Sequence, residues 1–395
     1  MTQSRRVLEA EDRARPLLAY PDGIDAARLS PDSAGALAGI CDARVLLGWT
    51  PEERPWLASD TVTGYTVIGG YALADAVRAG RLRCLPVRLS AVPRLLEHLR
   101  PDVAVVAGVR RGAELAFRGT VGWGPAAARI ACAVVVEVDD RADDLGGPVI
   151  PGNVVAVVER DDAPIPAPAP RACDDVDLAI GRRVVALLPE GPTLQLGPGG
   201  IAEAIVASLD RPVRIWSGLL TDAMASLDAR GLLTGTVTAG YTWGGEPIAR
   251  LARAGRLTLA PVEVTHDVST VAAIPRFVGC NTALQVGLDG AVNVERVGGR
   301  IVAGIGGHAD FCAAGSRSAG GFSLIALRAA DRSGGSTIVR TVDVVSTPRC
   351  DIDIVVTEHG VADLRGRSDE QRAAALIEVA APAHRDALGA SRFSS

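Results

Sequence analysis

The chain has 395 residues, 48% of them hydrophobic and 22% charged, a composition that predicts a globular protein with room for two domains and large buried sheets. Its net charge is −5, with arginines spread along the chain, so no basic stripe indicates a nucleic acid partner. All 41 basic residues are arginine, and the lack of lysine excludes a Schiff-base lysine and a P-loop.

The seven cysteines are widely spaced and form no C-x-x-C pair. This spacing argues against a zinc site or a disulfide framework, and we expect no metal and no permanently bound cofactor. The N-terminus opens without an apolar segment, and no run of 18 or more apolar residues occurs later in the chain, so no leader and no membrane span are predicted. We expect a cytoplasmic protein.

Short apolar runs bounded by Gly, Pro or Asp alternate with Ala-, Arg- and Leu-rich stretches of helical period along the chain. This alternation is typical of parallel sheets covered by helices and predicts an α/β fold. In chain order, strands are expected at residues 44–48, 103–107, 131–138, 193–196, 213–216 and 352–357.

Alternating prolines from Pro164 to Pro170 cannot form a helix or a central strand. We place a linker at 163–173, between a first domain at 1–162 and a second at 174–395. Two α/β halves of similar size suggest a duplicated unit. Helices are expected at 174–188 and, after a capping box of Ser368 and Gln371, through Val379, with Pro382 breaking the chain beyond it.

The segment 357–366, T-E-H-G-V-A-D-L-R-G, resembles the C-terminal signature of the acetyl-CoA hydrolase/transferase family. Further blocks at 281–290 and 304–311 stand in the order of that family, as do similar blocks at 64–87 and 193–201. The resemblance is to class I CoA-transferases of the 4-hydroxybutyrate CoA-transferase type. It implies two similar CoA-transferase-type domains, mostly parallel sheets flanked by helices, with an acyl-CoA site between them.

The resemblance also implies a set of site residues. Glu358, after an apolar strand, would face the active site, and the turn of Gly306, Gly307 and His308 would supply N–H donors to the thioester oxygen. The expected substrate or CoA contacts are Gly197, Gly199, Gly200, Asn281, Ala309, His359 and Gly360. In the alternative interpretation Glu358 is a solvated strand-end acid, the glycines form tight connections, and His308, where the family more often has glutamine, is structural.

One position departs from the implied pattern. Family members that exchange CoA between carboxylic acids would carry a nucleophilic glutamate where this chain has Gln285, and a neutral amide cannot attack a thioester. We therefore expect Gln285 to hold substrate by hydrogen bonds, with Glu358 or His359 as general base. Glu295 as a replacement nucleophile is the least favoured alternative.

Two other interpretations of the motifs stay open. Gly197 to Ala202 fits G-x-G-x-x-A after a strand, with Asp222 about 20 residues on, as in dinucleotide-binding units. His308, Asp310, Ser316 and Ser318 include the residue types of a serine hydrolase, but no G-x-S-x-G elbow surrounds either serine. We expect Ser316 to cap a helix N-terminus.

We predict an acyl-CoA-processing enzyme, a CoA-transferase or acyl-CoA hydrolase acting at a thioester, without the usual glutamyl-CoA intermediate. Its substrates would be an acyl-CoA and a small carboxylic acid or other acceptor, and we expect a homodimer with no membrane partner. The first alternative is a catalytically inactive acyl-CoA-binding homologue or partner subunit. An NAD(P)-dependent oxidoreductase is the more distant one.

Overall fold

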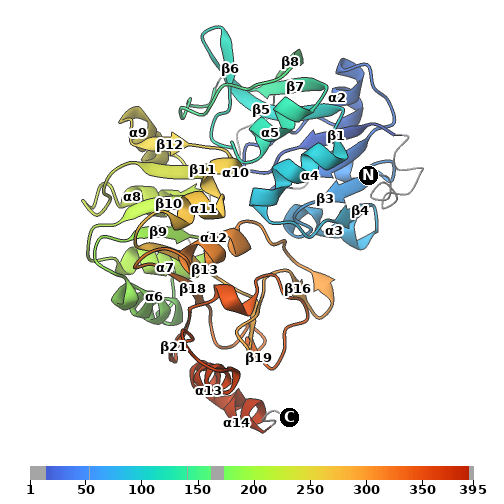
Figure 1. The fold of residues 1–395 in the computed structure, drawn as a ribbon. Helices are drawn as coiled ribbons and strands as arrows, with labels where there is room; N and C mark the ends of the chain where they lie inside the picture. The colour runs from blue at the N-terminus through green and yellow to red at the C-terminus, as the bar shows by residue number, and fades with distance from the viewer. Residues whose placement is uncertain (1–14, 53, 140, 162–172, 391–395) are drawn as a thin grey trace. The chain divides into compact units, whose positions relative to one another are not determined.

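The computed structural model describes residues 15–52, 54–139, 141–161 and 173–390. The chain divides into two compact units, one made of Met1–Val87 with Ala91–Ile165, the other of Arg88–Ser90 with Pro166–Ser395. Each unit is built on its own mostly parallel sheet, with helices packed against it (Figure 1). The linker predicted at 163–173 lies outside the described residues, except for Cys173.

The sheet of the first unit has the strand order β4-β3-β2-β1-β5-β7-β8, with every neighbouring pair parallel. A further strand, β6, pairs antiparallel with β5. The strands are β1 (Leu17–Tyr20), β2 (Arg44–Leu47), β3 (Gly64–Thr66), β4 (Leu82–Cys84), β5 (Val103–Arg111), β6 (Glu114–Ala116), β7 (Ala133–Val138) and β8 (Val154–Glu159).

Short helices connect these strands. They are α2 (Pro31–Leu37), α3 (Ala74–Arg78), α4 (Val92–Leu99) and α5 (Gly124–Ile130), with 3₁₀ turns η1 (Pro55–Ala58), η2 (Tyr71–Leu73) and η3 (Leu89–Ala91). Helix α2 begins at Pro31 because the Ser30 side chain caps its N-terminus by accepting a hydrogen bond from the Ser33 N–H. The central strands are buried on both faces, as in β1 and β2, where every residue is buried.

The main sheet of the second unit has the order β12-β11-β10-β9-β13-β18-β20-β21, in which only β21 runs antiparallel to its neighbour. Its strands are β9 (Thr193–Leu196), β10 (Arg214–Thr221), β11 (Val237–Trp243), β12 (Leu257–Leu259), β13 (Phe277–Asn281), β18 (Phe322–Ala326), β20 (Ile354–Thr357) and β21 (Gly360–Asp363).

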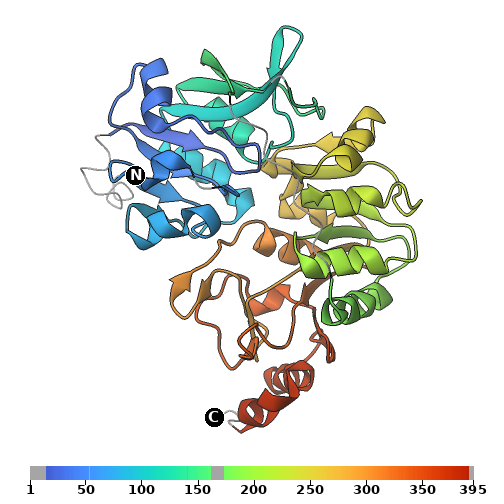
Figure 2. The same ribbon diagram turned by 180° about the vertical axis from the view of Figure 1, so that it is seen from behind.

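Helices cover both faces of this sheet. Helices α6 to α9, coloured green to yellow, follow one another along one face (Figure 2), while α10, α11 and α12 lie on the other (Figure 1). The helices are α6 (Asp175–Leu187), α7 (Gly200–Ser208), α8 (Asp222–Ser226), α9 (Glu246–Arg253), α10 (Val262–Thr265), α11 (Val268–Ala272), α12 (His308–Gly315), α13 (Asp369–Val379) and α14 (Pro382–Gly389), with the 3₁₀ turn η4 (Arg349–Asp351).

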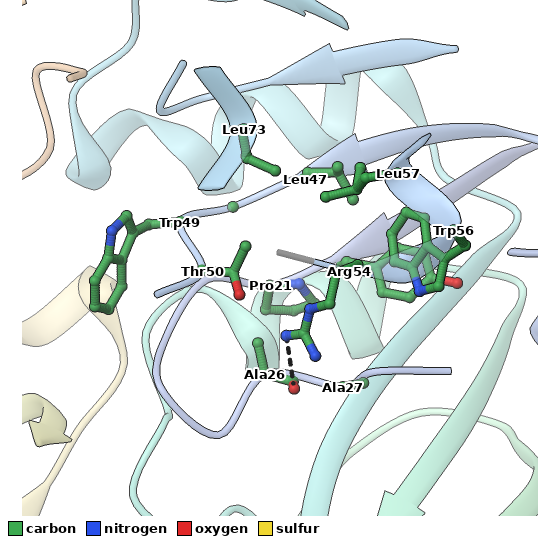
Figure 3. Close-up of a pocket in the computed structure, with 12 residues that line it drawn as sticks. Pro21, Ala26, Ala27, Leu47, Trp49, Thr50, Arg54, Trp56, Leu57 and Leu73 are labelled. Atoms are coloured by element: carbon green, nitrogen blue, oxygen red, sulfur yellow. Dashed lines mark hydrogen bonds between the residues drawn. The ribbon is translucent and has the colours of Figure 1, made fainter. Parts of the chain in front are cut away.

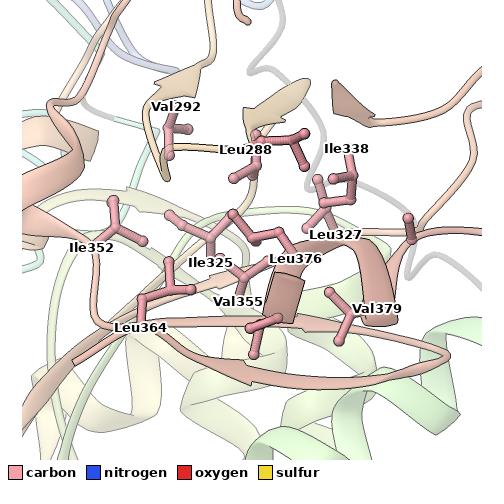
Figure 4. Packing of buried hydrophobic residues seen from close by; sticks show 14 of the residues in the cluster. Leu288, Val292, Ile325, Leu327, Ile338, Ile352, Val355, Leu364, Leu376 and Val379 are labelled. Carbon is pink, nitrogen blue, oxygen red and sulfur yellow. The ribbon is translucent and has the colours of Figure 1, made fainter. Parts of the chain in front are cut away.

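Small strands between α11 and η4 form a separate layer. A three-stranded sheet has the order β15-β14-β19, and β16 pairs with β17. Their bounds are β14 (Gln285–Gly287), β15 (Val292–Asn293), β16 (Arg296–Val297), β17 (Arg300–Ile301) and β19 (Ile338–Val339). Apolar residues of this layer and of β18, β20 and α13 form one buried cluster, which includes Leu288, Val292, Ile338, Ile325, Val355 and Leu376 (Figure 4).

The two large sheets share one topology. In each, the first strand lies inside the sheet, the next three strands add on one side, and the following strand adds on the other. The order therefore reverses between β1 and β5 and between β9 and β13, and such reversals open a crevice at the carboxyl ends of the strands. The predicted class, two similar α/β domains with parallel sheets, is confirmed.

Several elements were predicted correctly from local sequence signals. Strand β9 has the predicted bounds, and α6 lies within the predicted helix with Asp174 as its N-cap. The capping box of Ser368 and Gln371 is present at the start of α13. Pro382 ends one helix and is also the first residue of the next, α14. A proline is tolerated in the first turn because the N–H that it lacks has no partner within the helix there.

One predicted cap is wrong. Ser316 comes after the last turn of α12 and does not begin a helix. The helix starts earlier, at His308, because the run from Ala309 to Gly315 is buried throughout and packs against β13 and β18. Among the residues described, no helix has the length and apolar composition needed to cross a membrane.

Candidate functional site

Most of the predicted site residues come after the carboxyl ends of parallel strands in the second unit. Strand β9 ends just before Gly197, β13 ends at Asn281, and β20 ends just before Glu358. Because the carboxyl ends of parallel strands meet at one edge of a sheet, these segments share that edge. The order reversal between β9 and β13 lies on the same edge.

The glycine-rich turn after β9 leaves its backbone open. A side chain at Gly197 or Gly199 would meet no atom within 4 Å, and Gly199 has a φ of +130°, a conformation that favours glycine. Gly200 begins α7, so the first N–H groups of that helix point out of the turn. Such a turn lets a phosphate approach the backbone closely.

Glu358 is held by the backbone of a neighbouring loop. Its Oε2 accepts a hydrogen bond from the Ala329 N–H at 2.9 Å, and its Oε1 lies 3.7 Å from Nε2 of His359. The Glu358 side chain is 19% exposed, so it is partly screened from water and still reachable. The preceding Thr357 fixes the strand end, because its hydroxyl donates to the Val379 carbonyl and accepts from the His359 N–H.

The residue before Ala329 ties this loop to the glycine-rich turn. The Arg328 guanidinium donates to Asp177 at 3.0 Å and to Asp174 at 2.7 Å. Asp177 in turn lies beside Gly200, where an added Cβ would be 3.0 Å from its carboxylate. The Arg328 contacts therefore connect the loop that holds Glu358 with the turn that opens α7.

The second glycine turn faces a buried histidine that the sequence did not indicate. A Cβ at Gly307 would be 2.5 Å from Cδ2 of His266, and a Cβ at Gly218 would be 3.0 Å from its Nε2. Burial lowers the pKa of His266 to about 3, so the imidazole is neutral. Its Nδ1 is 2.8 Å from the Thr265 hydroxyl. A lone histidine after a short helix carries no sequence signal, and only the fold places it here.

His308 opens α12 and is half-buried, with an imidazole that is neutral. Burial lowers its pKa to about 4, against a smaller opposing effect of the Thr282 backbone. Nδ1 lies 2.8 Å from the Thr347 hydroxyl and 3.7 Å from the Cys312 sulfur. Its Nε2 is buried and, within the described part of the chain, has no hydrogen bond of regular geometry.

Gln285 is bonded within the small three-stranded sheet. It pairs with Asn293 across β14 and β15, and its side-chain oxygen accepts from the Asn293 amide at 2.9 Å. Glu295 is buried, and its carboxylate accepts a hydrogen bond from the Ser346 hydroxyl at 2.6 Å. Both side chains have structural partners, and the role implied for Gln285 rests on the resemblance alone.

In the described chain, Gln285 and Glu358 are connected indirectly, by backbone hydrogen bonds that begin at the neighbour of Gln285. A relay of three hydrogen bonds leads from Val286 N–H to the Thr337 carbonyl, from Thr337 N–H to Ala329, and from Ala329 N–H to Glu358. The expected convergence of Gln285, Gly307 and Glu358 on one cleft stays a prediction.

The other predicted contacts have different degrees of access. The Asn281 amide is buried and donates to the Cys312 sulfur at 3.5 Å. The Ala309 side chain is buried in α12. Gly360 opens β21 opposite Thr357, where an added Cβ would lie 3.4 Å from Val379. A role for Asn281 or Ala309 in binding would therefore have to use the backbone.

Comparison with known proteins shows the family of the chain. The acetyl-CoA hydrolase/transferase C-terminal domain matches residues 248–391. A butyryl-CoA:acetate CoA-transferase of Anaerostipes caccae is 30% identical, over 77% of this chain and 74% of its own. The chain belongs to the acetyl-CoA hydrolase/transferase family.

Two further similarities extend over most of the chain. A 4-hydroxybutyrate coenzyme A transferase of Clostridium kluyveri is 28% identical, over 81% of this chain and 79% of its own. The crystal structure of RipA from Yersinia pestis superimposes with a TM-score of 0.84 at 24% identity, over 95% of this chain and 93% of that one. The two-unit fold is thus the fold of a solved structure.

In this family member, Asp222 is already engaged by the protein. Its two carboxylate oxygens accept from the Gly245 N–H at 3.0 and 2.9 Å. In a dinucleotide-binding unit the corresponding acid binds a ribose hydroxyl. The Asp222 carboxylate instead links the starts of α8 and α9, so the dinucleotide pattern at Gly197 to Ala202 lacks its acidic partner.

The residues of a serine hydrolase do not assemble in this family member. Asp310 accepts from both the N–H and the hydroxyl of Ser90, at 3.1 and 2.6 Å, whereas His308 contacts Thr347. The Ser316 hydroxyl donates to the Ala313 carbonyl. Among the described residues, no group of three or more His, Cys, Asp or Glu side chains is arranged to hold a metal.

Proposed function

We propose that this protein is an acyl-CoA-processing enzyme, a CoA-transferase or acyl-CoA hydrolase that acts on a thioester and takes a small carboxylic acid or water as acceptor. The observation that carries the proposal is the position of Glu358, which is anchored through one oxygen at the carboxyl edge of the sheet. The names of the relatives, CoA-transferases among them, support the same chemistry.

Each part of the site has its own role in this proposal. The open backbone at Gly197 and Gly199 receives a phosphate of CoA. The turn of Gly306 and Gly307 supplies N–H donors to the thioester oxygen, where negative charge develops. Glu358 acts as general base, with its carboxylate oriented by Ala329.

In hydrolysis, Glu358 takes a proton from water while the water oxygen bonds to the thioester carbonyl carbon. The C–S bond then breaks, and the CoA thiolate takes up the proton. In transfer, the acceptor carboxylate replaces water and forms a mixed anhydride, which the CoA thiolate attacks at the acceptor's carbonyl carbon. Neither route needs a covalent bond to the protein, and we propose that Gln285 only positions substrate.

Incubating the protein with a panel of acyl-CoA thioesters, with and without acetate, and measuring free CoA with a thiol reagent tests the activity. Release of CoA without acetate indicates hydrolysis, and formation of acetyl-CoA indicates transfer. Binding of CoA esters without turnover would favour the inactive homologue, and binding of NAD without CoA would overturn the proposal.

Intact-mass spectrometry after borohydride treatment tests the missing intermediate. We expect no CoA-dependent mass change on the wild-type protein during turnover. A CoA-dependent mass change mapped to Glu295 or Glu358, as left by reduction of a glutamyl thioester to the alcohol, would show that a protein carboxylate forms the thioester after all.

A further inference from the structure

Arg54 and Asp310 are buried, charged side chains that the proposed function does not use. Arg54, in the first unit, lines a hollow together with Tyr20, Trp49 and Trp56 (Figure 3). The space inside this hollow holds about one water molecule, which is too little for a substrate. Asp310, in the second unit, lies instead at the start of α12, directly after the second glycine turn of the candidate site.

Asp310 occupies a helix position from which an acid can cap the helix. Because α12 begins at His308 with Gly307 as its N-cap, Asp310 is the third residue of the first turn. In a capping box, the side chain at this position accepts a hydrogen bond from the N–H of the N-cap residue. The Asp310 carboxylate instead accepts from the N–H and the hydroxyl of Ser90, at 3.1 and 2.6 Å. Among the described residues, the Gly307 N–H is left without a protein acceptor.

The contact with Ser90 also brings a backbone donor to the glycine turn. The segment Arg88–Ser90 belongs to the second unit and forms a parallel bridge with Gly306. Within this segment, the Leu89 N–H donates to the Gly306 carbonyl at 3.0 Å. Because Ser90 is bound to α12 through both of its hydrogen bonds to Asp310, the neighbouring Leu89 N–H is held at the turn.

Holding the Gly306 carbonyl also sets the direction of the next N–H. The carbonyl of Gly306 and the N–H of Gly307 belong to one peptide group, which is planar and trans, so the two point in opposite directions. The turn is further confined by His266, since a Cβ at Gly307 would lie only 2.5 Å from its ring. A donor with a fixed direction and no protein acceptor is suited to stabilise charge that develops on a thioester oxygen.

We propose that Asp310 is a positioning residue for this donor: by holding Ser90 and Leu89 against the turn, it directs the Gly307 N–H toward the thioester oxygen. This inference rests on the proposed function, which requires such a donor. Burial raises the pKa of Asp310 to about 6, while the hydrogen bonds from Ser90 oppose the rise. The carboxylate is therefore charged at pH 8 and can accept both hydrogen bonds.

Steady-state kinetics of Asp310→Ala at pH 8, with the acyl-CoA thioester that the wild type turns over fastest, tests this role. An oxyanion donor acts mainly in the transition state, so kcat should fall about 10- to 100-fold while KM stays close to its wild-type value. Asp310→Asn should keep most of the wild-type kcat, because its amide can accept from the Ser90 N–H and donate to the Ser90 hydroxyl. An unchanged kcat in Asp310→Ala, or an equal loss in both variants, would overturn the proposal.

Asp353→Ala is the matched control within the same unit. The Asp353 carboxylate also accepts a hydrogen bond from a serine N–H, that of Ser323 at 2.9 Å. Asp353 precedes β20, however, and so lies at the opposite end of that strand from Glu358. The control should lower the thermal midpoint and leave kcat close to that of the wild type. A similar loss of kcat in the control would assign the effect of Asp310→Ala to general destabilisation.

Hydrogen exchange measured by mass spectrometry tests the contact itself. In Asp310→Ala, the amide of Leu89 should exchange about tenfold faster or more, because the segment that carries it is released. Ser90→Ala keeps the backbone hydrogen bond to Asp310, so it should give a smaller increase, and it keeps the test decisive if Asp310→Ala does not fold. Unchanged exchange at Leu89 in the folded variants would overturn the proposal.

The two proposals fail in different ways. If the wild type turns over no thioester, the proposed function is wrong, and the donor role of Gly307 is wrong with it. If the wild type is active and Asp310→Ala is equally active, only the positioning role of Asp310 is wrong.

Discussion

The carboxylate of Glu358 accepts a hydrogen bond from the Ala329 N–H at 2.9 Å. This contact joins the loop after β20 to the loop after β18, two neighbouring parallel strands. One carboxylate oxygen is thereby fixed, and the other, 3.7 Å from Nε2 of His359, remains on the side of the imidazole. A general base needs this combination of a fixed position and a free oxygen.

Glu358→Gln should lower kcat/KM for acyl-CoA hydrolysis about 100-fold or more, because an amide cannot accept a proton from water. The amide oxygen can still accept from the Ala329 N–H, so the fold should be kept. Steady-state kinetics with a thermal melt measures both quantities. Glu378→Gln, at an exposed position of α13, is the control for the same chemical change. Similar activity in the two variants would exclude Glu358 as the base.

Gly307→Ala should lower the free energy of unfolding by about 1–3 kcal/mol, because the added methyl group overpacks the site. Its Cβ would lie 2.5 Å from His266, so the His266 ring, which packs against Phe311 with centroids 4.7 Å apart, would have to shift. Urea denaturation gives the difference. Gly197→Ala meets no atom within 4 Å and should leave stability nearly unchanged. Equal losses in both variants would contradict the steric account.

Stability should fall as the pH is lowered from 7 to 5. Burial lowers the pKa values of His266 and His308 from 6.5 to about 3 and about 4. Below pH 6.5 the unfolded chain therefore binds protons that the folded chain does not, and acidification favours unfolding. Burial raises the pKa of Asp310 to about 6 and also raises the pKa values of Asp353 and Glu203, so these carboxyl groups oppose the trend toward the acid end of the range. The trend from the two imidazoles should therefore be clearest between pH 7 and 6.

Each histidine changes the free energy of unfolding by at most about 1.4 kcal/mol per pH unit in this range. Urea denaturation at pH 7, 6 and 5 measures the slope. His308→Asn, whose amide can replace Nδ1 as a partner of Thr347, should reduce that slope. A free energy of unfolding that is constant or rises on acidification would show that the two imidazoles are not kept neutral by the fold.

Ser368→Ala should destabilise the protein by about 0.5–2 kcal/mol, the usual cost of losing an N-cap. The Ser368 hydroxyl accepts from the Gln371 N–H at 3.4 Å, and the Gln371 side chain accepts from the Ser368 N–H at 2.9 Å. Because the two side chains form one capping box, Ser368→Ala combined with Gln371→Ala should cost less than the sum of the single changes. Strict additivity in thermal or urea unfolding would argue against the box.

Local patterns in the sequence were sufficient for much of the fold. Strand β9 is a short segment bounded by Pro192 and Gly197, and α13 starts at its own capping box, so the sequence signal for each is local. The small sheet of β14, β15 and β19 was not expected from the sequence. Its strands have two or three residues, and β14 pairs with β19 across more than 40 positions, so they are too short for a periodic signal.

In the candidate site, too, some features could be predicted from local sequence and others were decided by tertiary structure. The sequence indicated Glu358 and the two glycine turns as candidates, because a strand end and a glycine-rich turn can each be recognised in consecutive residues. The neutral, buried His266 against Gly307 and the hydrogen bonds between Asp310 and Ser90 were decided only by tertiary structure. The physical reason is that burial and hydrogen-bond pairing depend on which distant segments pack together, and a linear sequence carries no direct record of that packing.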